Sequence, residues 1–145
     1  METIIQRWYD MIRINSVNGH EVDMADYVAE QLRAMGLEPR YSYFPEDREA
    51  RERPSVWTVL DSGKPGKTVM LIGHIDTVAV SDKWNTNPFE PTEIDGKVYG
   101  RGAMDMKGGL AAILETLEYY TRHKDEITGR IEACFVSDDE GLSKG

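Results

Sequence analysis

Residue types that bind metals or move protons are concentrated in three short stretches of the chain. The first is Gly73–Thr77, where His74 and Asp76 stand two residues apart directly after an apolar run. A neutral imidazole is a good zinc ligand, and a nearby carboxylate can accept its other N–H and fix the tautomer. Taken alone, the stretch favours a strand-end histidine that makes only local hydrogen bonds over a metal ligand.

The second stretch is the acidic run Asp138-Asp139-Glu140, which follows another apolar run. Three adjacent carboxylates repel one another unless water solvates them or cations hold them together. On a loop of this kind one carboxylate can bind a metal while its neighbour handles protons. Both readings stay open from the run alone.

The third stretch, Tyr99–Gly109, is rich in glycine and contains Asp105 just before a helical pattern. For Asp105 alone, capping of that helix is the expected role. A glycine-rich turn before a helix can also cradle a phosphate. However, the position three residues after Gly102 is Asp105 and not glycine, and no Walker loop is present. A nucleotide-binding module therefore remains only a weak rival.

The elements around these stretches alternate between helical and strand patterns. We expect helices over Ile4–Ile14, Val22–Met35 and Leu110–Leu117, and strands over Glu38–Phe44, Val56–Leu60, Thr68–Ile72 and Ile131–Val136. Asn18 is placed to cap the second helix, and Gly36 to end it. Thr68–Ile72 is apolar without alternation, which predicts a central strand covered on both faces. The charges of Glu46–Arg53 predict a solvated loop. The pattern favours a layered α/β domain.

Composition narrows the classes of protein further. The chain has 145 residues, 40% hydrophobic and 30% charged, with a formal charge of −9. Such an acidic chain is expected to repel nucleic acid. Apolar runs fall short of the ~20 residues that a membrane helix needs. The single cysteine, Cys134, and the lack of a secretory pattern at Met1 predict a cytoplasmic protein.

Together the stretches resemble the signatures of a zinc-dependent family of deacylases and exopeptidases. Its members include acetylornithine deacetylase, succinyl-diaminopimelate desuccinylase, aminoacylase and glutamate carboxypeptidase. Gly73–Val78 looks like the first signature, Trp84–Phe89 like a W-x-x-x-P-F segment, and Asp95–Gly109 like the second signature. The resemblance runs from the first helix to the last residue. It implies a zinc-exopeptidase-like catalytic domain with a mostly parallel central sheet and flanking helices.

The resemblance also implies roles for individual residues. His74 would bind one zinc ion, Glu140 a second, and Asp105 would bridge the two, with cobalt or manganese as substitutes for zinc. Asp76 would sit behind His74 and orient it. Asp139 stands where the family has a glutamate that acts as general base, and its shorter side chain can cost ~10²-fold in rate. The peptide bond after Asp105 is expected to be cis.

The reaction that the resemblance implies is hydrolysis of the amide bond of an N-acyl amino acid or small peptide by a zinc-activated water. The family's remaining carboxylate and histidine ligands, and its lid or dimerisation domain, are not found in this sequence. We therefore expect residues 1–145 to be the N-terminal portion of the catalytic domain and to be inactive alone. A homo-oligomer, or association with the missing half, is the expected assembly. The rival is a non-catalytic assembly module with a weak metal site.

Overall fold

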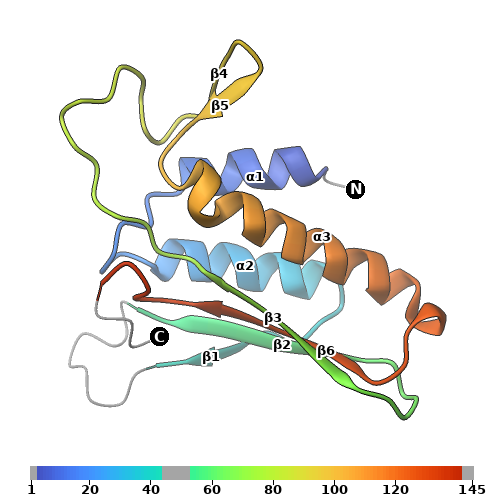
Figure 1. Ribbon diagram of the computed structural model, residues 1–145. Helices are drawn as coiled ribbons and strands as arrows, with labels where there is room; N and C mark the ends of the chain where they lie inside the picture. Colours follow the sequence, from blue (N-terminus) through green and yellow to red (C-terminus); the bar gives the residue numbers. More distant parts are fainter. Residues whose placement is uncertain (1–2, 44–52, 142–145) are drawn as a thin grey trace.

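The computed structural model describes residues 3–43 and 53–141, and Figure 1 shows its arrangement. In chain order the elements are α1 (Ile4–Arg13), α2 (Val22–Ala34), β1 (Arg40–Ser42), β2 (Ser55–Asp61), β3 (Thr68–His74), β4 (Thr92–Ile94), β5 (Lys97–Tyr99), the turn Ala103–Lys107, α3 (Gly108–Arg122), the short turn Lys124–Glu126 and β6 (Arg130–Val136). The layered α/β class expected from the sequence is confirmed.

The main sheet has the strand order β1-β2-β6-β3. β1 and β6 are both antiparallel to β2, and β3 is parallel to β6. The expectation of a mostly parallel sheet is therefore wrong for the described strands. β2 and β3 are joined by a short turn and run in opposite directions. The chain then crosses over through α3, which brings β6 back parallel to β3 and between the two.

The three α-helices of the described residues, α1, α2 and α3, lie on the same face of the sheet (Figure 1). Between the helices and the sheet lies the apolar core, which includes Val28, Leu32, Leu60, Leu110, Leu114, Leu117 and Phe135. Along β6 the residues facing the helices are buried and their neighbours are not, as the alternation of a strand requires. The apolar faces of α2 and α3 are the packing faces, whereas at the start of α1 Ile4 and Ile5 remain 39% and 50% exposed.

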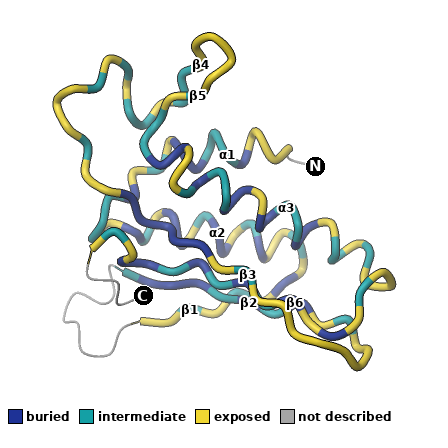
Figure 2. The backbone as a smooth tube through the Cα atoms, in the orientation of Figure 1, coloured by how far each residue is buried: buried dark blue, intermediate teal, exposed yellow. Residues whose placement is uncertain are grey.

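β3 is an edge strand in the described sheet, contrary to the prediction of a strand covered on both faces. Val69, Met70 and Ile72 remain 54%, 56% and 57% exposed. Figure 2 shows the N-terminal part of β3 as exposed. Only the C-terminal Gly73 and His74 are buried. The apolar run Thr68–Ile72 therefore correctly predicted a strand, but it did not predict whether the strand is central or at the edge of the sheet.

Two local predictions at the first helices have different outcomes. Gly36 follows α2 with a φ of +79°, which confirms it as the residue that ends the helix. α2 begins at Val22 after Glu21, without a side-chain cap, so the capping role predicted for Asn18 is wrong. None of the described helices is long and apolar enough to cross a lipid bilayer.

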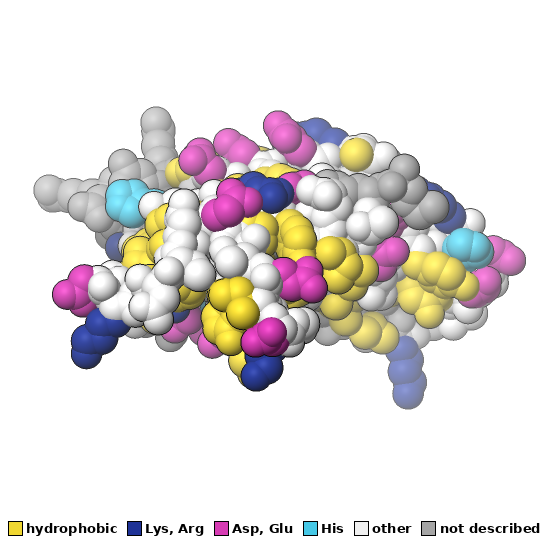
Figure 3. Space-filling view, turned by 90° about the horizontal axis from the view of Figure 1, so that it is seen from above, with side chains coloured by type: hydrophobic (Ala, Val, Ile, Leu, Met, Phe, Trp, Pro, Cys, Tyr) yellow, Lys and Arg dark blue, Asp and Glu magenta, His cyan; other side chains and the backbone are white. Residues whose placement is uncertain are grey.

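The strand predicted over Glu38–Phe44 is present as the shorter β1. Phe44 and most of the Glu46–Arg53 stretch lie outside the described residues. Arg53 is described, is half-buried and forms an ion pair with Asp138. Viewed from the helix side, acidic and basic side chains are interspersed with apolar ones (Figure 3).

Candidate metal centre

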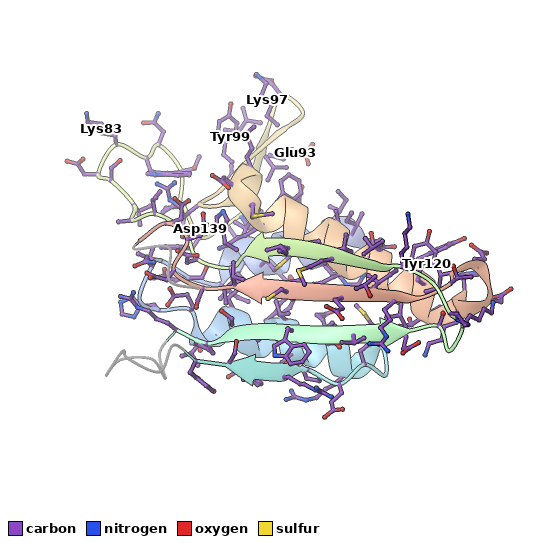
Figure 4. All side chains as sticks on the ribbon, turned by 60° about the horizontal axis from the view of Figure 1, so that its bottom comes forward. Lys83, Glu93, Lys97, Tyr99, Tyr120 and Asp139 are labelled. Atoms are coloured by element: carbon purple, nitrogen blue, oxygen red, sulfur yellow. The ribbon has the colours of Figure 1, made fainter. Side chains whose placement is uncertain are left out.

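The candidate site lies where β3 and β6 end. Because the two strands are parallel, their carboxyl ends open at the same edge of the sheet. His74 is the last residue of β3, and the acidic run begins two residues after β6. Figure 4 shows the labelled Asp139 at this end of the strands. Asp105 reaches the same place from the turn before α3.

Three side chains from these separate segments come together. One potential ligand atom each of His74, Asp105 and Glu140 lies within 4.8 Å of the other two. His74 is buried, Glu140 is half-buried and Asp105 is exposed. An imidazole and two carboxylates are a donor set that suits zinc, with a protected side and an accessible side. The residues present therefore fit a metal ion.

The hydrogen bonds of His74 support this fit. Nδ1 lies 3.0 Å from the backbone carbonyl oxygen of Asp76, so Nδ1 carries a proton. Nε2 lies 3.0 Å from Oδ1 of Asp105. When the imidazole is neutral, Nε2 presents a lone pair to a carboxylate, and such a pair of acceptors needs a proton or a cation between them.

The pKa of His74 reflects the same surroundings. Burial lowers it, but the hydrogen bond to Asp105, the Asp76 carbonyl and the charges of Asp76 and Asp139 outweigh burial and raise the pKa above its usual value. The carboxylates thus favour a positive charge at this point, and a metal ion would meet the same field.

The carboxylate of Asp76 organises the acidic loop more directly than it contacts the imidazole. Its Oδ1 is 3.7 Å from Nδ1 of His74. The same carboxylate accepts hydrogen bonds from the backbone N–H groups of Asp139, at 3.2 Å, and Glu140, at 2.9 Å. Asp76 is 1% exposed. It therefore supports His74 through its backbone and the loop with Glu140 through its side chain.

The turn that carries Asp105 is held in place by hydrogen bonds to α1 and to the residue that follows α1. The expected capping role of Asp105 is not observed, because α3 begins at Gly108 after Lys107, without a side-chain cap. The predicted cis peptide bond between Asp105 and Met106 is present. The Trp8 indole donates to the carbonyl of Ala103 at 2.8 Å.

Lys107 provides a second anchor for this turn. Its ammonium donates to the carbonyl of Ile14 at 2.8 Å, and the residue is 1% exposed. Burial lowers the pKa of Lys107 to about 7, with the nearby Arg101 charge acting in the same direction.

Gly102, at a φ of +74°, leaves no room for a side chain, because a Cβ there would lie 2.6 Å from Thr77.

Asp139 points toward the cluster but stands back from it. Its Oδ2 is 3.9 Å from Nε2 of His74, and its side chain is 56% exposed. A cavity of about 210 Å³ adjoins the cluster. Its lining residues are Thr77, Val78, Gly100, Arg101, Gly102, Ala103, Met104, Asp105 and Glu140. The accessible side of the site therefore opens into a space that can admit a small group.

Sequence reasoning missed two residues of this site. Asn18 was assigned to a helix cap and Arg53 to a solvated loop, yet both donate hydrogen bonds to Asp138. Asp138 itself is 3% exposed. The run of carboxylates at one strand end was the available signal, because such groups require donors from elsewhere in the chain once they are buried.

Comparisons with known proteins agree with this geometry. Residues 70–145, just over half of the chain, match the model of peptidase family M20/M25/M40. The chain is 36% identical to an uncharacterized metallohydrolase of Methanocaldococcus jannaschii, over 99% of this chain and 38% of that protein. It is 33% identical to the succinyl-diaminopimelate desuccinylase of Buchnera aphidicola, over 92% and 34%. The chain belongs to the M20/M25/M40 peptidase family, a family of metallohydrolases.

Solved structures show the same fold. Human carnosine dipeptidase 1 matches with a TM-score of 0.82 at 24% identity, over 97% of this chain and 32% of that one. An M20 family metallo-carboxypeptidase of Sulfolobus solfataricus matches with a TM-score of 0.81 at 19% identity, over 97% and 32%. A Bacillus subtilis protein described as a dinuclear metal-binding M20 peptidase matches at 0.67 and 17%, over 94% and 35%. The chain thus spans about a third of the length of these relatives.

Proposed function

We propose that the cluster binds divalent metal ions, with zinc as the natural ion, in a hydrolase that cleaves the amide bond of an N-acyl amino acid or small peptide. The observation that carries the proposal is the convergence of His74, Asp105 and Glu140 within 4.8 Å at the ends of two parallel strands. The desuccinylase and dipeptidase among the relatives support amide hydrolysis.

Each residue has a distinct role in this proposal. His74 would hold one ion and Glu140 the other, and Asp105, the most exposed of the three, would be shared by both. When bound, the metal ions would lower the pKa of a water molecule and polarise the scissile carbonyl. Asp139 accepts the proton of the attacking water at its carboxylate and delivers it to the leaving amine nitrogen. Asp76 holds His74 and the loop bearing Asp139 and Glu140 in register.

We further propose that this cluster is the N-terminal portion of a larger catalytic site. A catalytic zinc usually has three protein ligands, and His74, Asp105 and Glu140 supply two to each ion at most. A further carboxylate and histidine, with a lid or dimerisation domain, would complete it. On this basis residues 1–145 alone are inactive, and a weak metal site without catalysis is the alternative.

We also propose that the chain associates with a further chain or segment, and that it resides in a reducing compartment. The exposed apolar edge of β3 supports pairing with a further chain or segment, either in a homo-oligomer or with the remainder of the domain. The free, half-buried Cys134 supports a reducing compartment such as the cytoplasm.

The test is the zinc content of the purified 145-residue chain together with its hydrolysis of N-acetyl amino acids, N-succinyl amino acids and dipeptides. We expect bound zinc and no turnover. A chain that takes up no zinc contradicts the proposed metal site. Turnover that is lost in Asp139→Asn contradicts the expectation that this portion is inactive alone.

A further inference from the structure

The loop between α1 and α2 lies directly against the segment that follows β3. The N–H of Thr77 donates to the carbonyl of Ser16 at 2.9 Å, and the N–H of Asn18 donates to the carbonyl of Thr77 at 2.9 Å. Val17 and Thr77 form an isolated parallel bridge. The backbone of Asn18 is therefore fixed beside the site by a short stretch of strand-like pairing.

From this position the side chain of Asn18 reaches two buried carboxylates. Its Nδ2 lies 3.0 Å from Oδ2 of Asp76 and 3.0 Å from Oδ1 of Asp138. Asp76 and Asp138 are 1% and 3% exposed. An amide nitrogen has two hydrogens, so one neutral group can donate to both anions at once.

The two carboxylates belong to different segments that the proposed metal site must keep in register. Asp76 accepts the backbone N–H groups of Asp139 and Glu140. Asp138 starts that loop with a φ of +64°, and its carboxylate also accepts a hydrogen bond from Arg53 at 2.7 Å. Without a shared donor, two buried anions side by side repel each other and push their segments apart.

We propose that Asn18 is a positioning residue of the metal site, because its carboxamide clamps Asp76 to Asp138 and thereby fixes the loop that presents Glu140. The inference rests on the proposed metal-dependent function. Packing around the clamp supports it, since a Cβ on Gly141 would lie 2.4 Å from Oδ1 of Asp138 and 2.8 Å from the Asn18 carboxamide. The clamp therefore packs directly against Gly141, where a side chain would collide with it.

The test compares Asn18→Asp with Asn15→Asp. Both substitutions keep the size of the side chain and add one negative charge in the same loop. Asn15 is exposed, and its Oδ1 accepts the N–H of Val17, which an aspartate can still do. Asn18→Asp instead replaces the shared donor with a third carboxylate. Asn18→Ala, which removes the donor without adding charge, carries the same test if Asn18→Asp does not fold.

Two readouts are needed on the 145-residue chain. Hydrogen exchange of the Asp139 and Glu140 amides reports the loop, with the β6 amides as an internal reference. Zinc affinity, from competition with a chromophoric chelator, reports the site. We expect Asn18→Asp to speed exchange of the two loop amides about tenfold or more. It should weaken zinc binding about 10- to 100-fold, the usual loss when a residue that hydrogen-bonds to a metal ligand or its support is removed. Asn15→Asp should match the wild type.

The outcomes separate this inference from the function on which it rests. Loop exchange and zinc affinity unchanged in both Asn18 variants would overturn the inference, and so would a uniform acceleration that includes the β6 amides. Zinc binding by the wild type that survives His74→Ala would contradict the proposed metal site instead. In that case selective loss of protection at Asp139 and Glu140 would still support Asn18 as the residue that fixes the loop.

Discussion

The two ends of the β3–β6 pair are closed in opposite ways. At the amino ends, backbone packs on backbone: the N–H of Gly129 donates to the carbonyl of Lys64 at 2.9 Å, and that of Arg130 to Lys67 at 3.0 Å. At the carboxyl ends, the ionisable side chains of His74, Asp76 and Asp138 are buried instead. At one end a Cβ on Gly66 or Gly129 would collide with the backbone, and the other end is built from buried side chains.

The two ends of the β3–β6 pair contribute differently to the free energy of folding. Backbone pairs at the amino ends satisfy each other without burying a charge. Buried carboxylates at the carboxyl ends cost free energy unless each has donors, and Asn18, Arg53 and the loop amides serve as those donors. The costly end is the one that can hold a metal ion.

Gly129→Ala should have the largest effect on stability. Gly129 has a φ of +74°, and a Cβ there would lie 2.0 Å from the carbonyl oxygen of Lys67. Backbone strain and this clash together should lower the free energy of unfolding by about 3 kcal/mol or more, measured by urea denaturation. Gly63→Ala is the matched control, because Gly63 has the same φ of +74° with no atom within 4 Å of its Cβ. Equal losses in the two variants would contradict the role given to close packing.

Asp76→Ala should have the next largest effect. The substitution leaves the Asn18 amide and two backbone N–H groups without their acceptor, which should lower the free energy of unfolding by about 2 kcal/mol. The comparison is Asp61→Ala at the other end of the sheet, where a half-exposed carboxylate pairs with Arg130 at 3.1 Å. That loss should be about 1 kcal/mol or less. A ranking in the reverse order would remove the contrast between the two ends.

Glu21→Gln should show a smaller effect that depends on pH. Burial raises the pKa of Glu21, and the charge of Asp76 adds to the rise, against the Gly19 N–H and Arg53, which lower it. The folded chain therefore holds this proton to a higher pH than the unfolded chain. Between the usual and the raised pKa, the free energy of unfolding must fall as pH rises.

The measurement for Glu21 is thermal unfolding from acidic to neutral pH. We expect wild type to lose stability relative to Glu21→Gln as pH rises through that window, and the difference to level off above it. Glu93→Gln, on the exposed β4–β5 hairpin, serves as the control and should stay parallel to wild type. A constant difference between wild type and Glu21→Gln would contradict the raised pKa.

Local features of the chain were predictable from the sequence, whereas partnerships between distant segments were not. The stripes of α2 and α3 required a buried face, and the apolar runs before His74 and Asp138 required strands whose ends carry polar groups. Those patterns placed His74 and the acidic run at strand ends, whereas the expectation that His74, Asp105 and Glu140 share one site came from the resemblance to a known family. The same resemblance added their expected roles.

The remaining features depend on contacts that no local pattern encodes. The apolar run of β3 is the same whether the strand is central or at the edge, so its exposure could not be predicted. Asn18 carries the signature of a helix cap, but pairing of its loop with Thr77 turns its side chain to two carboxylates instead. The direction of β2 follows from the insertion of β6 between two strands joined by a turn.

The most direct test of the metal site is a titration of the 145-residue chain with Co²⁺, followed by its visible absorption, in wild type, His74→Ala and His20→Ala. His20 is an exposed histidine two residues before α2 and serves as the matched control. We predict that wild type and His20→Ala develop the same spectrum with the same affinity. His74→Ala should bind about 10-fold or more weakly and lose the nitrogen contribution to that spectrum. An unchanged spectrum and affinity in His74→Ala would contradict the assignment of this cluster as the metal centre.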